Sequence, residues 1–210
     1  MRLRKVKNAL EKVNSSKYII INPKEYKGKF KKIFNNDNPI CLEIGTGKGN
    51  FIKSMALNHP NINYIGMEKS ESVLVRAVEK VEELEINNLR FILGDAKELR
   101  DIFNKEIDTI YLNFSDPWPK NRHSKRRLTS EVFLELYEDI FKSDKHIVMK
   151  TDNILLFGYS LSSLSLYGYK LRKVSLDLHS EDIENYMTEY EEKFSNMGYK
   201  INYVDAYKEK

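Results

Sequence analysis

The chain has 210 residues, of which 41% are hydrophobic and 31% charged, a composition typical of a soluble globular protein with one main domain. Its 35 basic and 31 acidic residues leave a net charge of +4, which is too small to establish nucleic-acid binding by itself. The single cysteine, Cys41, excludes intrachain disulfides and multi-cysteine metal sites, and no apolar run reaches the roughly 18 residues that a membrane span needs. We therefore expect a cytoplasmic protein that uses neither a membrane nor a metal ion.

Residues 1–38 form a basic N-terminal extension, and the polar stretch at 35–39 predicts its boundary with a main domain at 39–210. Near the start, apolar residues at helical spacing alternate with cationic ones: Leu3, Val6, Leu10 and Val13 among Arg2, Arg4, Lys5 and Lys7. The pattern is compatible with a short helix packed on the domain and with a basic arm that contacts phosphates.

From residue 40 onward, short apolar strands alternate with helical segments. Strands are predicted at 40–44, 63–67, 89–93, 109–114, 147–150, 169–176 and 201–207. Helices are predicted at 50–58, 71–85, 98–103, 128–141 and 154–167, with Val132, Leu136 and Ile140 facing inward from the fourth. This alternation predicts an α/β fold on a mostly parallel seven-stranded sheet with helices on both faces.

Acidic side chains stand at the carboxyl ends of five predicted strands: Glu43, Glu68, Asp95, Asp116 and Asp152. Open α/β sheets bind ligands in the crevice beyond these ends. We therefore expect the five acids to surround one cleft. The alternative is that each one is an ordinary cap on a strand end.

A glycine-rich turn, Gly45-Thr46-Gly47-Lys48-Gly49, follows the first strand and lets the backbone approach a ligand closely. A dinucleotide fingerprint is not met, because Asn50 stands where it requires glycine and Glu43 would repel a diphosphate. The phosphate-binding P-loop signature is also absent. An acid before such a turn instead suits S-adenosylmethionine, which has no phosphate, carries a sulfonium and an ammonium, and offers ribose hydroxyls to a carboxylate.

Two later acids extend this cofactor prediction. Glu68 closes the second strand, near the offset at which a ribose-binding acid follows a glycine turn. Asp95 is placed to accept a hydrogen bond from the adenine amino group. The predicted cofactor site thus contains Glu43, Gly45, Gly47, Glu68 and Asp95.

The segment after the fourth strand combines a rigid acid with aromatic and cationic side chains. Asp116 is followed by Pro117, Trp118 and Pro119, and because proline fixes φ, the carboxylate is presented by a stiff turn. The next residues form an electrostatic footprint for a polyanion: Lys120, Arg122, His123, Lys125, Arg126 and Arg127. The alternatives are that Asp116 merely starts a turn and that the cations form a solvated face.

Near the C-terminus, Thr188-Glu189-Tyr190-Glu191 has the Thr-x-x-Glu spacing of a helix capping box. Spacing by itself gives this motif a structural role only.

Taken in order along the chain, these motifs resemble those of the bacterial tRNA (guanine-N7-)-methyltransferases. The resemblance runs from the N-terminal segment to near the C-terminus, and six blocks carry it: 42–49, 66–68, 94–95, 112–120, 150–153 and 188–191. The Asp-Pro-Trp-Pro-Lys block is specific, whereas the glycine turn is shared with many methyltransferases. Met67, Lys69 and Ser70 depart from the apolar residues that are more usual beside Glu68.

The resemblance implies a Rossmann-like class I S-adenosylmethionine-dependent methyltransferase domain at 39–210, with a reversed last hairpin. It implies that Glu43, Glu68, Asp95 and Asp116 contact S-adenosylmethionine or the reacting centre, with Asp116 as the catalytic residue. Substrate tRNA would be held by Lys120, Asp152, Thr188, Glu189, Tyr190 and Glu191, and further RNA contacts would come from Arg122, His123, Ser124, Lys125, Arg126 and Arg127. The family methylates a guanosine in the tRNA variable loop, usually at position 46, to 7-methylguanosine.

Guanine N7 holds a lone pair and no proton, so its methylation needs no general base. A carboxylate fixed at Asp116 can orient the guanine through its N1–H and amino group and stabilise the charge that moves to the ring. Three alternatives are an amino-group methyltransferase acting on adenine N6 or cytosine N4, a non-catalytic RNA-binding protein and a nicotinamide dehydrogenase. The sequence leaves open whether the protein is a monomer or a homodimer.

Overall fold

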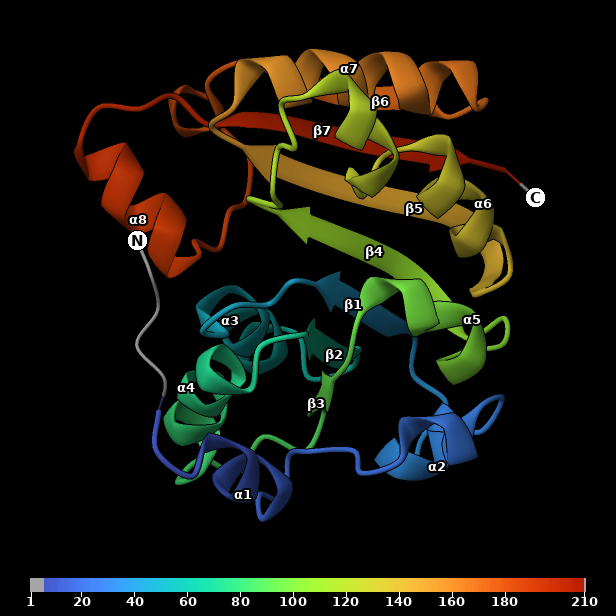
Figure 1. Ribbon diagram of the computed structural model, residues 1–210, viewed down its shortest axis with the longest axis vertical. Helices are drawn as coiled ribbons and strands as arrows, with labels where there is room; N and C mark the ends of the chain where they lie inside the picture. The colour runs from blue at the N-terminus through green and yellow to red at the C-terminus, as the bar shows by residue number, and fades with distance from the viewer. Residues whose placement is uncertain (1–5, 210) are drawn as a thin grey trace.

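The computed structural model describes residues 6–209 and contains a seven-stranded sheet in the order β3-β2-β1-β4-β5-β7-β6 (Figure 1). The strand bounds are β1 Ile40–Ile44, β2 Asn63–Glu68, β3 Leu89–Leu93, β4 Ile107–Asn113, β5 Phe141–Thr151, β6 Lys170–Ser175 and β7 Asn202–Lys208. Every pairing among β1 to β5 is parallel, and β7 runs antiparallel to both β5 and β6. The mostly parallel sheet with a reversed last hairpin is therefore confirmed.

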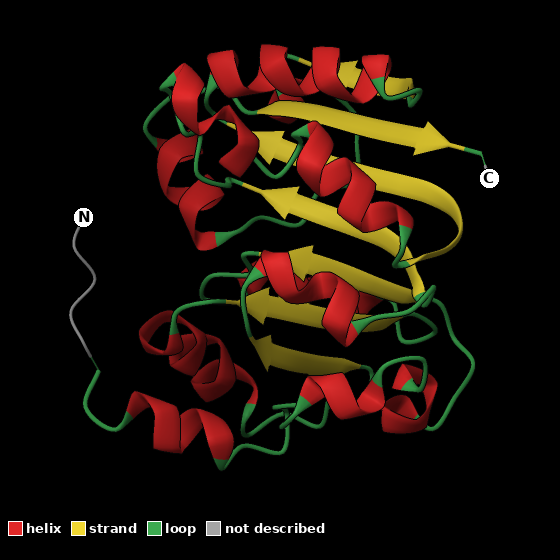
Figure 2. Cartoon of the chain, turned by 45° about the vertical axis from the view of Figure 1, so that its right-hand side comes forward, coloured by secondary structure: helices red, strands yellow, loops and turns green. Residues whose placement is uncertain are grey.

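Helices cover both faces of the sheet, as the two views in Figures 1 and 2 show. One face packs against α2 (Phe30–Phe34), α5 (Leu99–Ile102), α6 (Glu131–Glu138) and α7 (Ile154–Leu166). The other face packs against α1 (Ala9–Asn14), α3 (Asn50–Asn58) and α4 (Glu71–Val81). A parallel strand between two helical layers needs apolar residues on both sides, which explains why all five residues of β1 are buried.

The prediction for residues 128–150 was wrong in its boundaries. The helix α6 spans only Glu131–Glu138, and β5 begins at Phe141 rather than at residue 147. Leu136 and Ile140 are buried as predicted, together with Phe133 and Tyr137, whereas Val132 is 48% exposed. The predicted inward face was therefore wrong only at Val132.

The N-terminal segment wraps around the β3 edge of the sheet. Tyr18 and Ile20 exchange backbone hydrogen bonds with Phe91 of β3. Val13 of α1 is buried against the α3–α4 layer, and Phe30 of α2 is buried against the opposite face. A packed N-terminal helix is thus observed, whereas the division into domains at residue 38 remains a prediction. The proposed basic arm falls mostly outside the described residues, at Arg2, Arg4 and Lys5.

The strand order reverses direction between β1 and β4. The chain moves outward from β1 to β2 and β3 and then returns to place β4 on the other side of β1. Loops after β1 and β4 therefore leave in opposite directions, and a crevice opens between them at the carboxyl ends of the strands. This crevice holds the candidate site.

Candidate active site

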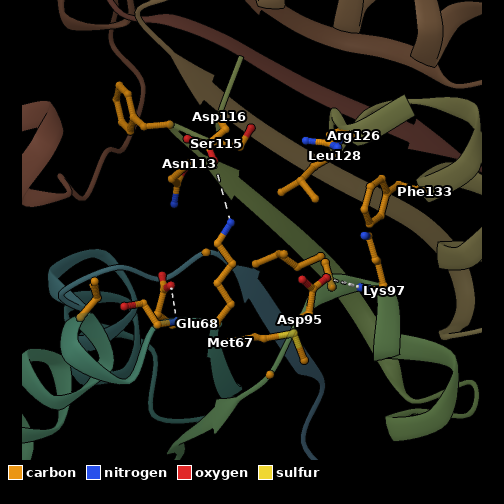
Figure 3. Close-up of a pocket in the computed structure, with 18 of the residues that line it drawn as sticks. Met67, Glu68, Asp95, Lys97, Asn113, Ser115, Asp116, Arg126, Leu128 and Phe133 are labelled. Atoms are coloured by element: carbon orange, nitrogen blue, oxygen red, sulfur yellow. Dashed lines mark hydrogen bonds and ion pairs between the residues drawn. The ribbon is translucent and has the colours of Figure 1, made fainter. Parts of the chain in front are cut away.

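A cavity of about 640 Å³ opens beyond the carboxyl ends of β1 to β4 (Figure 3). Four of the residues predicted to contact the cofactor or the reacting centre line it: Gly45, Glu68, Asp95 and Asp116. Apolar walls come from Met67, Leu128 and Phe133, among others. The acids at three strand ends are therefore brought to one cleft, whereas Glu43 and Asp152 do not line it.

The glycine turn after β1 forms the cavity's edge near β2. Gly45, Gly47 and Gly49 all have positive φ values, of 80°, 60° and 80°, which L side chains rarely adopt. A Cβ added at Gly49 would lie 2.7 Å from the Cβ of Ala77 in α4. The backbone conformation therefore favours glycine at all three positions, and the close approach of α4 is a second, independent reason at Gly49.

Glu43 lies beneath this turn and is completely buried. Its Oε2 accepts a hydrogen bond from the Thr46 hydroxyl at 2.6 Å, and its Oε1 accepts one from Asn113 Nδ2 at 2.8 Å. Burial raises the pKa of Glu43 to about 7, although both hydrogen bonds oppose this rise. The carboxylate ties β1 to the end of β4 and does not line the cavity.

Glu68 and Asp95 face the cavity and also make local structural contacts. Glu68 accepts hydrogen bonds from the backbone N–H groups of Gly47 at 3.2 Å and Ser70 at 3.0 Å. Asp95 caps the short helix η2 (Ala96–Glu98) by accepting from the backbone N–H of Lys97 at 2.9 Å. Both carboxylates keep acceptor capacity for a ligand. The capping interpretation and the cofactor interpretation therefore coexist at these two residues.

Asp116 is presented by a strained loop. Phe114 and Trp118, on either side of it, have positive φ values of 51° and 41°, which are unusual for such large residues. Arg127 stabilises the loop, since it donates hydrogen bonds to the carbonyls of Pro117 at 3.2 Å and Trp118 at 3.0 Å. The Asp116 carboxylate is exposed, and Lys69 Nζ lies 4.0 Å from its Oδ2, a pair that Figure 3 marks across the cavity.

The basic segment continues from this loop as η3 (Asn121–Arg126). Its side chains divide into two groups. Arg126 lies 4.8 Å over the Trp118 ring and lines the cavity, and His123 meets the same ring edge-on at 5.8 Å. The remaining cations of η3 and its N-cap are exposed to solvent: Lys120, Arg122 and Lys125. Ser124 is half-buried between them.

The motif at 188–191 starts α8 (Glu189–Asn196). Thr188 caps the helix, because its hydroxyl accepts from the backbone N–H of Glu191 at 2.9 Å. The Glu191 carboxylate is fully buried and forms an ion pair with Lys150 at 2.6 Å. Glu189 forms an ion pair with Lys80 of α4. The capping interpretation is thus confirmed for Thr188, and the two glutamates anchor α8 to the body of the domain.

Tyr190 connects this helix to the Asp116 loop. Its hydroxyl donates to Asp152 Oδ2 at 3.0 Å, and its ring lies 5.0 Å from that of Phe114. Phe194 stacks on the other side of Tyr190 at 4.1 Å. Asp152, although absent from the cavity wall, is therefore coupled to the loop that carries Asp116 through a partly exposed aromatic side chain.

Residues 37–204 match the family model described as "Putative methyltransferase". The chain is 53% identical to the tRNA (guanine-N(7)-)-methyltransferase of Lachnoclostridium phytofermentans, with 100% of both chains covered. It is 55% identical to the protein of the same description from Geobacillus sp., covering 96% of this chain and 93% of the relative. The chain belongs to the tRNA (guanine-N(7)-)-methyltransferase family.

Solved structures support the fold of this family member independently of sequence. A structure described as an antibiotic-related methyltransferase matches 87% of this chain with a TM-score of 0.67 at 18% identity. The 16S rRNA methyltransferase KamB matches the same share with a TM-score of 0.65 at 12% identity. At such identities the likeness concerns the fold, and it confirms the Rossmann-like class I methyltransferase architecture.

Three residues of the tRNA (guanine-N(7)-)-methyltransferase site were not assigned a role from sequence: Lys69, Asn113 and Lys150. Lys150 directly follows the apolar run Ile147-Val148-Met149, and that position was a usable signal for a buried cation in need of a partner. Lys69 and Asn113 gave no comparable signal, because their partners, Asp116 and Glu43, are distant in the sequence. Within residues 6–209, no group of three or more His, Cys, Asp or Glu side chains could hold a metal ion, and no helix is long and apolar enough to cross a membrane.

Proposed function

We propose that this chain transfers a methyl group from S-adenosylmethionine to N7 of a guanosine in the variable loop of tRNA, at position 46. One observation carries the proposal: in a member of this family, the cavity that gathers Gly45, Glu68, Asp95 and Asp116 opens directly beside the basic segment. A cofactor cleft and an RNA-binding surface thus share one edge, where Asp116 is located. Methylation of tRNA is consistent with the cytoplasmic location expected from the sequence.

The cavity fits the chemistry of S-adenosylmethionine. Its ribose and adenine require hydrogen-bond acceptors, which Glu68 and Asp95 supply, and its apolar parts can pack against Met67 and Phe133. Glu43 supports the turn from below. When bound, the cofactor supplies a methyl group on a positively charged sulfur, and that group is open to attack by a lone pair.

Asp116 orients the guanine and needs no proton transfer, because N7 is unprotonated. Its exposed carboxylate can accept from the N1–H and amino groups of the base, and the loop holds it in place through Arg127. As the methyl group moves, positive charge develops on the purine, and the fixed carboxylate stabilises it. Lys69 must give up its contact with Asp116 when the guanine binds.

The tRNA backbone is held by the exposed cations of the basic segment, Lys120, Arg122 and Lys125, while Arg126 and Trp118 form a stacked pair at the cleft's edge. Across the cleft, Tyr190 and Asp152 present a hydroxyl and a carboxylate to the RNA. Thr188, Glu189 and Glu191 act by fixing the start of α8. His123, Ser124 and Arg127 support the segment from within.

The test is to incubate the protein with labelled S-adenosylmethionine and unmodified tRNA, and to locate the product by borohydride–aniline cleavage, which cuts at 7-methylguanosine. Cleavage at a single variable-loop position is the expected result. Label on adenine or cytosine would instead support an amino-group methyltransferase. Binding of tRNA without any label transfer would support a non-catalytic RNA-binding protein.

A further inference from the structure

Asn113, at the end of β4, carries a polar atom that the fold leaves unsatisfied. The side chain is 5% exposed and lines the cofactor cavity, and it also lines a second cavity of about 210 Å³ between α3 and the β4–β5 face of the sheet. No described residue donates a hydrogen bond to its Oδ1. A buried acceptor without a hydrogen-bond partner lowers the stability of the folded state by roughly 1–3 kcal/mol. We therefore expect a ligand or a water molecule to donate a hydrogen bond to this atom.

The orientation of this amide is set by Glu43. Asn113 Nδ2 donates to Glu43 Oε1 at 2.8 Å. When Glu43 is ionised, or carries its proton on Oε2 toward the Thr46 hydroxyl, Oε1 is an acceptor and holds the amide nitrogen. In these states the amide cannot turn its nitrogen away from Glu43 without losing a buried hydrogen bond, and Oδ1 is held as an acceptor.

The position of Asn113 identifies the donor. It lies on the cavity wall between Gly45 of the glycine turn and Asp116 of the reactive edge. The methionine part of the cofactor must span this region if the ribose is at Glu68 and the reacting edge is at Asp116. That part carries an α-ammonium group, which needs acceptors, and Glu43 is fully buried and does not line the cavity.

We propose, on the basis of the function proposed above, that Asn113 Oδ1 accepts a hydrogen bond from the α-ammonium group of S-adenosylmethionine. Glu43 then acts on the cofactor through this amide. A hydrogen bond to a charged donor in a buried position is stronger than one between neutral groups. Asn113 is accordingly a positioning residue that selects cofactors carrying the amino group.

The experiment compares two ligands by calorimetry without turnover: S-adenosylhomocysteine and its desamino analogue, in which hydrogen replaces the α-amino group. The wild-type protein should bind S-adenosylhomocysteine about 10- to 100-fold more tightly, the range expected for a hydrogen bond to a charged group. Asn113→Leu should bring the ratio of the two dissociation constants close to one. Asn113→Asp, which can share a proton with Glu43 and keep an acceptor, should preserve the preference.

Asp95→Ala is the matched control, because it should weaken both ligands equally and leave their ratio unchanged. A wild-type ratio near one, or an Asn113→Leu variant that weakens both ligands equally, would overturn the assignment and leave Oδ1 to water in the second cavity. If Asn113→Leu does not fold, Asn113→Ser allows the same comparison, since serine is too short to place an acceptor there. Failure of the wild-type protein to bind S-adenosylhomocysteine at all would instead refute the proposed function.

Discussion

Two acids predicted for the same site, Asp116 and Glu191, occupy opposite environments. The Asp116 side chain is 69% exposed, and its nearest cation, on Lys69, is 4.0 Å away and equally open to solvent. The Glu191 side chain is 0% exposed and is bound by Lys150, Asn185 and His179. Screening by water makes the first pair weak, whereas the second is a buried ion pair whose partners depend on each other.

The difference separates two ways in which an acid can serve a site. An exposed carboxylate on a rigid loop is free to exchange a weak partner for a substrate. A buried carboxylate cannot leave its partners without a large cost, so Glu191 serves by fixing α8, from which Tyr190 reaches the Asp116 loop. Glu43, buried beneath the glycine turn, belongs with Glu191 in this respect.

The largest effect is expected from breaking the buried pair. Lys150→Met leaves Glu191 without its cation, and the free energy of unfolding should fall by about 3–5 kcal/mol in urea denaturation. Lys69→Met, at the exposed pair, is the matched control and should change the unfolding free energy by less than about 0.5 kcal/mol. A similar loss of unfolding free energy in both variants would show that the buried and the exposed ion pair contribute equally to stability.

For the exposed acid, the effect should fall on catalysis instead of stability. Asp116→Ala should lower turnover on the order of 100- to 1,000-fold, the range for removal of one preorganised electrostatic group. Its unfolding free energy and its affinity for tRNA should stay close to the wild-type values, as measured by urea denaturation and filter binding. A parallel loss of stability would make Asp116 a folding residue.

Glu43 allows a test by pH. Burial raises its pKa from 4.5 to about 7, so the folded state binds more protons than the unfolded state between these values. This group therefore makes the protein progressively less stable as pH rises through that window. The Glu43→Gln variant lacks this titration. In the absence of cofactor, the difference in unfolding free energy between the variant and the wild type should therefore shift in favour of the variant by up to about 3 kcal/mol as the pH rises from 4.5 to 8. Parallel pH profiles would show that Glu43 titrates normally.

The smallest effect is expected in the basic segment. Replacing the exposed Arg122 and Lys125 by glutamine should flatten the salt dependence of tRNA binding by roughly 0.7–0.9 log units per lost phosphate contact. Arg127→Gln should leave this slope unchanged, because its guanidinium is committed to the carbonyls of Pro117 and Trp118. Equal changes in slope would show that all the cations contact RNA alike.

Much of the fold followed from the sequence, because hydrophobic periodicity and turn residues are local properties. These local patterns predicted the alternation of strands and helices, the glycine turn and the acids at the strand ends. The limits of α6 and β5 were not predicted, because apolar residues continue past Glu138, where the helix ends, and Phe141 already belongs to β5. Pairing with β4 decides where this strand begins.

The sequence by itself determined the sheet, the glycine turn and the acids at the strand ends, three of which line one cleft. Tertiary structure alone decided what each acid does. The Glu43–Asn113 hydrogen bond joins residues 70 positions apart, and the Lys150–Glu191 ion pair joins residues 41 positions apart. Such partners are set by strand register and helix docking, and the resulting burial decides whether a carboxylate is available to a substrate or holds the fold together.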